Sequence, residues 1–315
     1  MFEEIIREIG KHNRIIIHRH SKPDGDAIGS QAGLKYLIEE NFPGKEVYAV
    51  GDAAGRYAFM DGSTPDVIPD GYYADALAIV LDTSSPALIS DARWQTAAAT
   101  ARIDHHIFLE KIAATEVVDS TYESCCGLVA EMARESGWRL TPAAARSLYT
   151  GMVTDSGRFR YSSTTPRTFR LAAYLTEQPF SLSDIYAALY ADDFDMIRMR
   201  ATFVLRVKFT ENRVGYIYTT RDELAATGLD SFTASRGMVG VMSDVRGVNI
   251  WVNFTETDAG VLCEIRSNKY NINPVAVKYG GGGHAMASGA TLPDHKTAMA
   301  MLADLDAMMK EDDRK

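Results

Sequence analysis

Acidic and histidine side chains stand in four short motifs of the sequence, each at the end of an apolar segment. The motifs are H-S-K-P-D-G-D, the lone Asp that ends A-L-A-I-V-L-D, then D-H-H, and finally V-T-D-S-G. Their acidic and imidazole residues are His20, Asp24, Asp26, Asp82, Asp104, His105, His106 and Asp155. Carboxylate and imidazole groups suit manganese, and carboxylate-rich sites also accept magnesium. The residue types therefore predict a site for divalent metal ions.

The set of ligands is large enough for two ions. Two metals held about 3.5–4 Å apart can clamp the attacking and leaving oxygens of a phosphoryl displacement. One carboxylate must bridge them, and Asp82, alone at the end of its apolar segment, suits that role. The chemistry predicted from these motifs is therefore the hydrolysis of a phosphorus ester.

Each motif alone has a simpler explanation. D-G-D matches a turn, because Asp and Gly are turn residues. The lone Asp82 matches a helix N-cap, and D-S-G matches an ordinary helix end. Two adjacent histidines alone indicate little. We predict a site because the motifs occur together and all follow apolar segments.

The segments that carry the motifs alternate between strand-like and helix-like patterns. Apolar or β-branched runs predict strands at 14–18, 46–50, 76–81 and 99–103. Helical patterns lie at 24–40, 126–136, 142–154, 167–175 and 184–189. This alternation predicts an α/β fold with an open, mainly parallel sheet flanked by helices. Ligands of such sheets bind outside the carboxyl ends of the strands, so the motifs should converge in one crevice.

The pattern changes after about residue 190. Runs at 215–219, 248–254 and 261–265 alternate like antiparallel strands. A Gly-rich stretch at 280–283 lies between two helical patterns, the second at 296–309. We predict a catalytic domain at 1–190, a linker helix at 191–202, and a smaller C-terminal α/β domain with a mixed sheet at 203–315.

Composition limits the classes of partner. A formal charge of -9 and a pI near 5.3 argue against a protein that coats long nucleic acid, since such binding needs clustered Lys and Arg. A short anionic substrate in a local basic pocket is still allowed. The three cysteines form no C-x-x-C pair, which favours free thiols in a reducing compartment. With neither a signal-peptide pattern nor a membrane-length apolar run, we expect a cytoplasmic protein.

The motifs together resemble those of the DHH phosphoesterase superfamily, named for Asp104-His105-His106. The resemblance covers nearly the whole chain. In the second half, I-R-S-N and G-G-G-G-H resemble the DHH-associated C-terminal domain of the bacterial oligoribonuclease, or nanoRNase, branch. That branch is also described as a phosphoadenosine-phosphate phosphatase. The resemblance implies hydrolysis of very short oligoribonucleotides from the 5′ end to nucleoside 5′-monophosphates, and removal of the 3′-phosphate from 3′-phosphoadenosine 5′-phosphate.

The resemblance also implies roles for the motif residues. The implied metal ligands are His20, Asp24, Asp26, Asp82, His105 and Asp155, with Asp82 as the bridge. We expect two ions, with Mn²⁺ preferred over Mg²⁺ or Co²⁺. His106 would contact the scissile phosphate or assist proton transfer, and Asp104 would orient a histidine.

Substrate binding is expected in the C-terminal domain. The implied residues are Arg266, Ser267, Gly281, Gly282, Gly283 and His284. Arg266 offers a guanidinium fork to phosphate, and His284 offers a donor that can switch. Glycines let the backbone approach a ligand closely, and successive N–H groups can form an anion-binding nest.

Other functions fit the same metal site. They are an inorganic pyrophosphatase or exopolyphosphatase, a phosphodiesterase of linear dinucleotides from cyclic dinucleotides, a long-strand exonuclease, and a non-catalytic nucleotide sensor. G-G-G-G-H argues against the pyrophosphatase, a long-strand exonuclease would need additional nucleic-acid-binding modules, and the intact motifs argue against the sensor. The expected partners are short oligoribonucleotides and phosphorylated nucleotides, with no long duplex and no membrane. The resemblance also suggests a homodimer through the first domain.

Overall fold

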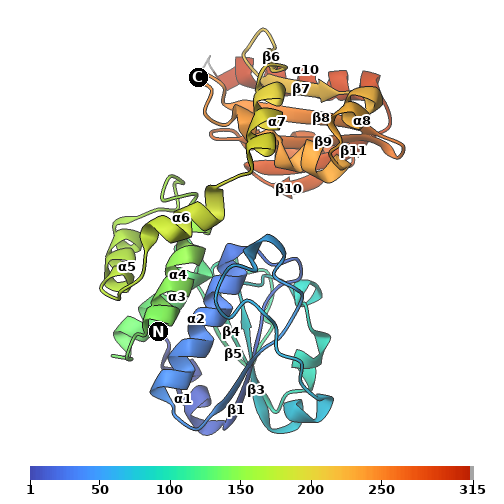
Figure 1. The fold of residues 1–315 in the computed structure, drawn as a ribbon. Helices are drawn as coiled ribbons and strands as arrows, with labels where there is room; N and C mark the ends of the chain where they lie inside the picture. Colours follow the sequence, from blue (N-terminus) through green and yellow to red (C-terminus); the bar gives the residue numbers. More distant parts are fainter. Residues whose placement is uncertain (313–315) are drawn as a thin grey trace. The chain divides into compact units, whose positions relative to one another are not determined.

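The computed structural model describes residues 1–312, which form two compact units. The first unit is Met1–Ala191 and the second begins at Asp192. Figure 1 traces both from the blue N-terminus to the red C-terminal helix. A helix, α7 (Phe194–Val204), overlaps the segment 191–202 for which a linker helix was expected. Its Phe203 is fully buried among side chains of the second unit, so α7 packs as part of that unit.

A five-stranded parallel sheet forms the centre of the first unit (Figure 1). The strands are β1 (Arg14–His18), β2 (Glu46–Ala49), β3 (Ala76–Leu81), β4 (Ala99–Asp104) and β5 (Thr115–Val118). Their order is β2-β1-β3-β4-β5, so the chain turns to opposite sides after β1. The carboxyl ends of β1 and β3 therefore flank the point where doubly wound sheets bind their ligands.

Helices cover this sheet. They are α1 (Glu3–Lys11), α2 (Gly25–Asn41), α3 (Cys125–Glu135), α4 (Pro142–Asp155), α5 (Pro166–Thr176) and α6 (Leu182–Tyr190). Short 3₁₀ turns lie at η1 (Gly55–Tyr57), η2 (Asp70–Asp75), η3 (Pro86–Leu88) and η4 (Ala92–Thr96). The sheet and helices share one apolar core, and every residue of β3 is buried, as its unbroken apolar run predicts.

Two glycines allow α2 and α4 to approach each other closely. A Cβ built at Gly29 would lie 2.6 Å from the carbonyl oxygen of Ser147 on α4. One built at Gly151 would lie 3.1 Å from the Cα of Asp26 on α2. Only glycine fits at such distances. This contact brings the first turn of α2 beside the end of α4, where acidic motif residues lie on both helices.

A six-stranded mixed sheet forms the second unit (Figure 1). Its strands are β6 (Lys208–Phe209), β7 (Gly215–Thr219), β8 (Ile250–Thr257), β9 (Gly260–Ser267), β10 (Gly282–His284) and β11 (Ala287–Leu292). The order is β10-β11-β9-β8-β7-β6, with β7 and β8 parallel and the other pairs antiparallel. The predicted α/β class, with a parallel and then a mixed sheet, is confirmed.

Different elements cover the two faces of the mixed sheet. One face packs on α9 (Asn273–Lys278) and α10 (His295–Asp312). The other packs on α7, α8 (Arg221–Thr227), a π-helical turn η5 (Thr233–Gly237) and η6 (Val239–Met242). The Gly-rich stretch lies between two helices, as its place between two helical patterns indicates, and a β10–β11 hairpin that was not predicted also stands between α9 and α10. Within residues 1–312, none of the helices has the length and apolarity that a membrane crossing requires.

Candidate metal centre

The four motifs meet at the carboxyl edge of the parallel sheet. His20 follows β1, Asp82 follows β3, and His105 follows β4. The first turn of α2 adds Asp24 and Asp26, and the last residue of α4 is Asp155. Their ligand atoms form three overlapping groups, within each of which all atoms lie within 4.8 Å of one another. The groups are His20–Asp24–Asp82, Asp26–His105–Asp155 and Asp82–His105–His106.

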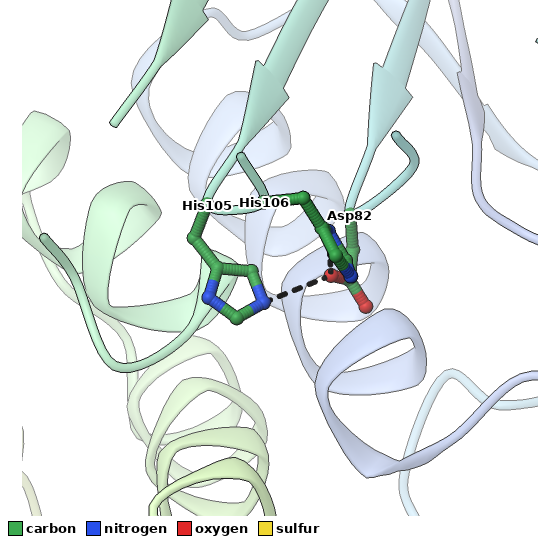
Figure 2. Close-up of side chains that lie close together, drawn as sticks. All are labelled: Asp82, His105 and His106. Carbon is green, nitrogen blue, oxygen red and sulfur yellow. Dashed lines mark ion pairs between the residues drawn. The ribbon is translucent and has the colours of Figure 1, made fainter. Parts of the chain in front are cut away.

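Asp82 links these groups. Its Oδ2 lies 3.5 Å from Nε2 of His20, and its Oδ1 lies 3.4 Å from Nε2 of His105. Figure 2 shows the Asp82 carboxylate beside both His105 and His106. The residue is 2% exposed, and Oδ1 makes no hydrogen bond within the described part of the chain. A buried acceptor without a donor is costly, and a cation would satisfy it.

The backbone of Asp82 is also unusual. Its φ is 50°, in the left-handed region that non-glycine residues rarely adopt. Its N–H still donates to the carbonyl of Ile103 at 3.1 Å, so the neighbouring strand holds this conformation. Such conformations cost about 1–3 kcal/mol and concentrate at functional sites. In this turn the Asp82 carboxylate lies between His20 and His105.

The charges of the cluster fit metal ions. Burial and the nearby carboxylates of Asp26 and Asp82 raise the pKa of Asp155 to about 9. Burial, followed by repulsion from Asp82, raises the pKa of Asp26 to about 7. Burial alone would lower the pKa of His20, but hydrogen bonds to Asp24 and Asp82 raise it to about 11. The raised pKa values of Asp26 and Asp155 reflect burial and repulsion between neighbouring carboxylates, and divalent cations would relieve this repulsion.

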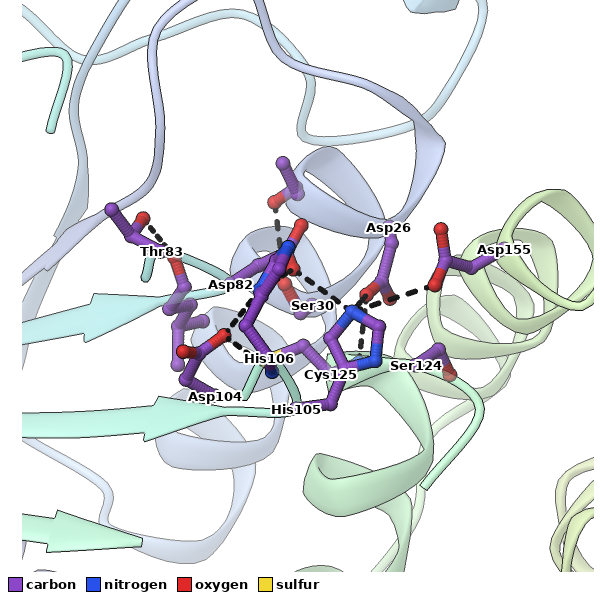
Figure 3. A network of polar contacts seen from close by, with 12 residues as sticks. Asp26, Ser30, Asp82, Thr83, Asp104, His105, His106, Ser124, Cys125 and Asp155 are labelled. Atoms are coloured by element: carbon purple, nitrogen blue, oxygen red, sulfur yellow. Dashed lines mark hydrogen bonds and ion pairs between the residues drawn. The ribbon is translucent and has the colours of Figure 1, made fainter. Parts of the chain in front are cut away.

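Asp26 is fixed by a helix that lies far along the chain. Its carboxylate accepts hydrogen bonds from the backbone N–H groups of Cys125 and Cys126, at 2.7 and 2.9 Å. Figure 3 shows this contact beside His105 and Asp155. Each oxygen keeps a free lone pair, so these hydrogen bonds orient the carboxylate and still leave it able to bind a metal ion. Sequence reasoning missed this support.

A second chain of contacts fixes His106. Its Nδ1 lies 2.7 Å from Oδ1 of Asp104, whose Oδ2 accepts a 2.5 Å hydrogen bond from the guanidinium of Arg102. Burial would raise the pKa of Asp104, but hydrogen bonds to His106 and Arg102 lower it to about 2. Arg102 and Asp104 are both fully buried. We did not predict Arg102, although its position two residues before Asp104 puts both on one face of β4.

Comparison with known proteins decides the family. The model of the DHH family, N-terminal domain, matches residues 14–152, and that of the DHHA1 domain matches residues 230–311. A Bacillus subtilis protein named bifunctional oligoribonuclease and PAP phosphatase NrnA is 34% identical over 314 residues, covering 99% of each chain. This chain belongs to the DHH family. The family predicted from the motifs is confirmed.

Further relatives extend over nearly the whole length. A Mycoplasma genitalium protein with the same name is 32% identical, covering 96% of this chain and 95% of its own. The crystal structure of an exopolyphosphatase-related protein from Bacteroides fragilis superposes with a TM-score of 0.87, over 98% of this chain and 97% of that one. At 23% identity this likeness shows the DHH fold alone. Asp155 lies just beyond the matched DHH range, so only its position supports it as a ligand.

The predicted substrate residues of the DHHA1 domain are only partly brought together. The strand register aligns His284 with Ala287, and Ala287 with Arg266, so His284 and Arg266 share one face of the sheet. The Arg266 guanidinium lies 3.0 Å from Oε2 of Glu264. Ser267 is next in the strand and faces the other side, where its hydroxyl donates to Asn249 and accepts from the N–H of Tyr270. These bonds give Ser267 a structural role.

Most glycines in the run 280–283 of the DHHA1 domain are explained by local backbone geometry. The N–H groups of Gly280 and Gly281 donate to carbonyls of α9, so they do not form the predicted anion nest. A Cβ at Gly281 would lie 2.1 Å from the carbonyl oxygen of Gly289, and Gly283 has a φ of 130°. A Cβ at Gly282 would meet nothing within 4 Å. Of the three glycines predicted to bind substrate, Gly281, Gly282 and Gly283, only Gly282 has open space into which a ligand could approach.

Proposed function

We propose that this chain is a metal-dependent phosphoesterase that hydrolyses short oligoribonucleotides from the 5′ end to nucleoside 5′-monophosphates. It also removes the 3′-phosphate from 3′-phosphoadenosine 5′-phosphate. The central observation is that Asp82 is shared by two groups of metal-ligand side chains at the edge of the parallel sheet. The names of the Bacillus subtilis and Mycoplasma genitalium relatives support the class of substrate.

The proposal includes two divalent ions, with Mn²⁺ preferred. His20 and Asp24 would hold one, and Asp26, His105 and Asp155 the other, with Asp82 between them. When bound, the ions would supply positive charge that acidifies water and neutralises the phosphate oxygens. Carboxylate and imidazole donors, with no thiol among them, support manganese, magnesium or cobalt over soft metals.

The protein's own groups would position the substrate. Nδ1–H of His106 donates to Asp104, and this hydrogen bond raises the pKa of His106 and so favours the imidazolium form. In that form Nε2 also carries a proton and would donate a hydrogen bond to a phosphate oxygen. A donor fixed in advance stabilises developing charge without having to reorganise. In the DHHA1 domain, Arg266 would bind a second phosphate of the substrate, and His284, on the same sheet face, would assist it.

One assay set tests the activity. The protein with Mn²⁺ is offered a ribodinucleotide, 3′-phosphoadenosine 5′-phosphate, a linear dinucleotide with a 5′-phosphate, pyrophosphate and a long single strand. We expect turnover of the first three and none of pyrophosphate. Phosphate release from pyrophosphate alone would overturn the proposal in favour of a pyrophosphatase. Tight nucleotide binding with no turnover would indicate a sensor.

A matched pair of variants tests the metal centre. Asp82→Asn keeps the shape of the side chain but removes its charge, and should abolish turnover while the fold persists. Asp75→Ala removes an exposed carboxylate from the opposite end of β3 and should leave turnover unchanged. Full activity of a folded Asp82→Asn protein would refute the assignment.

Two expectations about context belong to the same proposal. A reducing cytoplasm suits the three buried cysteines, which are unpaired. A homodimer through the first unit, suggested by resemblance, is tested by light scattering with and without Mn²⁺; a mass of one chain at micromolar concentration would exclude it.

A further inference from the structure

A groove of about 600 Å³ lies on the second unit, between the segment leading into η5 and the β9–β11 part of the mixed sheet. Its volume is within the usual range of about 300–1,000 Å³ for small-molecule sites. The wall includes Phe232, Ser235 and Arg236, and the floor includes Glu264 and Gly289. Ser235 and Arg236 belong to a stretch, 235–238, in which the resemblance suggests a nucleotide-contacting loop, whereas Phe232, Glu264 and Gly289 were not predicted to bind substrate.

Strand register explains why the floor is hollow. Gly282 is paired with Gly289, and Gly289 is paired with Glu264, so these positions form one row across β10, β11 and β9. Directly opposed residues point to the same face of a sheet. Gly282 and Gly289 leave no side chain above the backbone at their positions, and Glu264, the third member of the row, also lines the groove.

The wall offers an aromatic platform. Phe232 is 64% exposed, and the guanidinium of Arg236 lies 5.9 Å from its ring centroid. Nucleobases stack on exposed aromatic side chains, and a nearby Arg can add a cation–π contribution. Exposure of a large ring on a groove wall is otherwise unfavourable, because it leaves apolar surface in water.

A buried hydroxyl completes the groove. Ser235 is 2% exposed, and its Oγ has no hydrogen-bond partner in the described part of the chain. Buried hydroxyls normally have a partner, so this one is prepared for a group that enters the groove. Its donor and acceptor capacity matches the polar edge of a nucleobase.

The groove adjoins the predicted phosphate residue. Glu264 and Arg266 are two residues apart on β9, point to the same face and form a 3.0 Å ion pair. Two strand residues span about 6.6 Å, comparable to the separation of the base and 5′-phosphate within one nucleotide. Arg266 therefore lies at the right distance to hold the phosphate of a nucleotide whose base fills the groove.

We infer that this groove is a nucleobase subsite, in which Phe232 stacks on the base and Ser235 hydrogen-bonds its edge. The inference rests on the proposed function, since it assumes a nucleotide substrate. It adds the recognition of the base, which the proposed function does not specify. The DHHA1 domain would recognise the base as well as the phosphate, so a phosphate ester without a base would be a poor substrate.

The test uses a ribodinucleotide, the same compound with each base removed in turn, and the full chain with Mn²⁺. For one of the abasic compounds, the wild type should show a KM about 10-fold higher than for the intact dinucleotide, as expected for the loss of one stacked base. Phe232→Ala should remove most of that difference, because it should raise the KM for the intact dinucleotide. Ser235→Ala should reduce the difference.

A matched control lies in the same unit. Phe209 is 47% exposed and lies 5.4 Å from the guanidinium of Arg213, outside the groove. Phe209→Ala should keep the full preference for the intact dinucleotide. Equal KM values of the wild type for intact and abasic compounds, or equal losses in both Phe variants, would overturn the subsite.

A binding measurement separates this inference from the proposed function. If no compound is hydrolysed, adenosine and guanosine 5′-monophosphates are titrated against the wild type and Phe232→Ala by calorimetry. If the nucleotides bind Phe232→Ala more weakly than the wild type, the nucleobase subsite is supported even though no compound is hydrolysed. Equal binding to both proteins would overturn the groove independently of catalysis.

Discussion

The carboxylate of Asp26 accepts a 2.7 Å hydrogen bond from the backbone N–H of Cys125, which is 99 residues further along the chain. Cys125 is the first residue of α3, so the positive end of the helix dipole faces a carboxylate that is surrounded by others. The contact holds Asp26 in place against the repulsion of the Asp82 and Asp24 carboxylates. The candidate metal centre is thus supported by a backbone contact from α3, in addition to the contacts among its candidate ligands.

Asp26→Asn should bind Mn²⁺ at least about 10-fold more weakly, since even residues that support metal ligands cost 10–100-fold when changed. The amide keeps only one acceptor for two N–H donors, so one of them is left unpaired. Calorimetric titration with Mn²⁺ measures the affinity, and circular dichroism confirms the fold. An unchanged affinity would show that Asp26 serves only to cap α3.

Without metal, the protein should become less stable as the pH rises from about 6 to 9. Because the folded-state pKa of Asp155 is raised to about 9, the folded protein binds more protons than the unfolded chain in this window. The pKa of His20, raised to about 11, acts in the same direction, since its charge stabilises the fold and is lost at higher pH.

Melting temperatures with a chelator and with Mn²⁺ check this dependence. Asp155→Asn removes one titrating group, so the chelated variant should gain stability over the wild type as the pH rises. Mn²⁺ should flatten the wild-type profile, because the cation replaces the bound protons. A chelated wild type that is as stable at pH 9 as at pH 6 would contradict the electrostatic picture.

Gly29→Ala should destabilise the protein by about 1–3 kcal/mol, the usual cost of overpacking. The added methyl would lie 2.6 Å from the carbonyl oxygen of Ser147, so α2 must move away from α4. Gly10→Ala is the matched control, since a Cβ there meets nothing within 4 Å and alanine favours helix α1 by about 0.5–1 kcal/mol. Urea unfolding measures both changes, and equal stabilities would disprove the close approach.

Gly282→Ala should fold normally but bind substrate more weakly, because its methyl enters the open space beside the groove. Gly281→Ala should instead destabilise the fold, by about 1–3 kcal/mol, since its methyl would collide with the backbone of β11. The comparison uses KM for a ribodinucleotide and the melting temperature. If Gly282→Ala has an unchanged KM, the backbone does not approach the substrate.

Arg102→Met should cost about 3–5 kcal/mol, because it leaves the buried charge of Asp104 without its partner. Arg102→Lys keeps the charge but loses the two-pronged contact with Asp104 and the carbonyl of Glu110. We expect the lysine variant to fold, with a lower kcat and an unchanged KM, since only the orientation of His106 is loosened. A fall in KM with an unchanged kcat would assign Arg102 a different role.

The sequence was most informative where apolar segments end in acidic or histidine residues. An unbroken apolar run such as 76–81 predicts both a buried strand and the edge at which Asp82 lies. The β10–β11 hairpin was missed because its sequence is rich in Gly and Ala, which have little preference for strands. The contact of Cys125 with Asp26 uses backbone atoms, so no side-chain pattern could reveal it.

The left-handed turn at Asp82 has an evolutionary consequence. With a φ of 50°, this position accepts Gly, Asn or Asp far more readily than longer or branched residues. Substitutions of Asp82 by Gly or Asn therefore preserve the turn but remove the carboxylate, whereas substitution by Glu, the other acidic residue, is disfavoured. Descendants that change this residue should be folded proteins that have lost hydrolysis and kept a nucleotide-binding surface, which is a short route from an enzyme to a receptor.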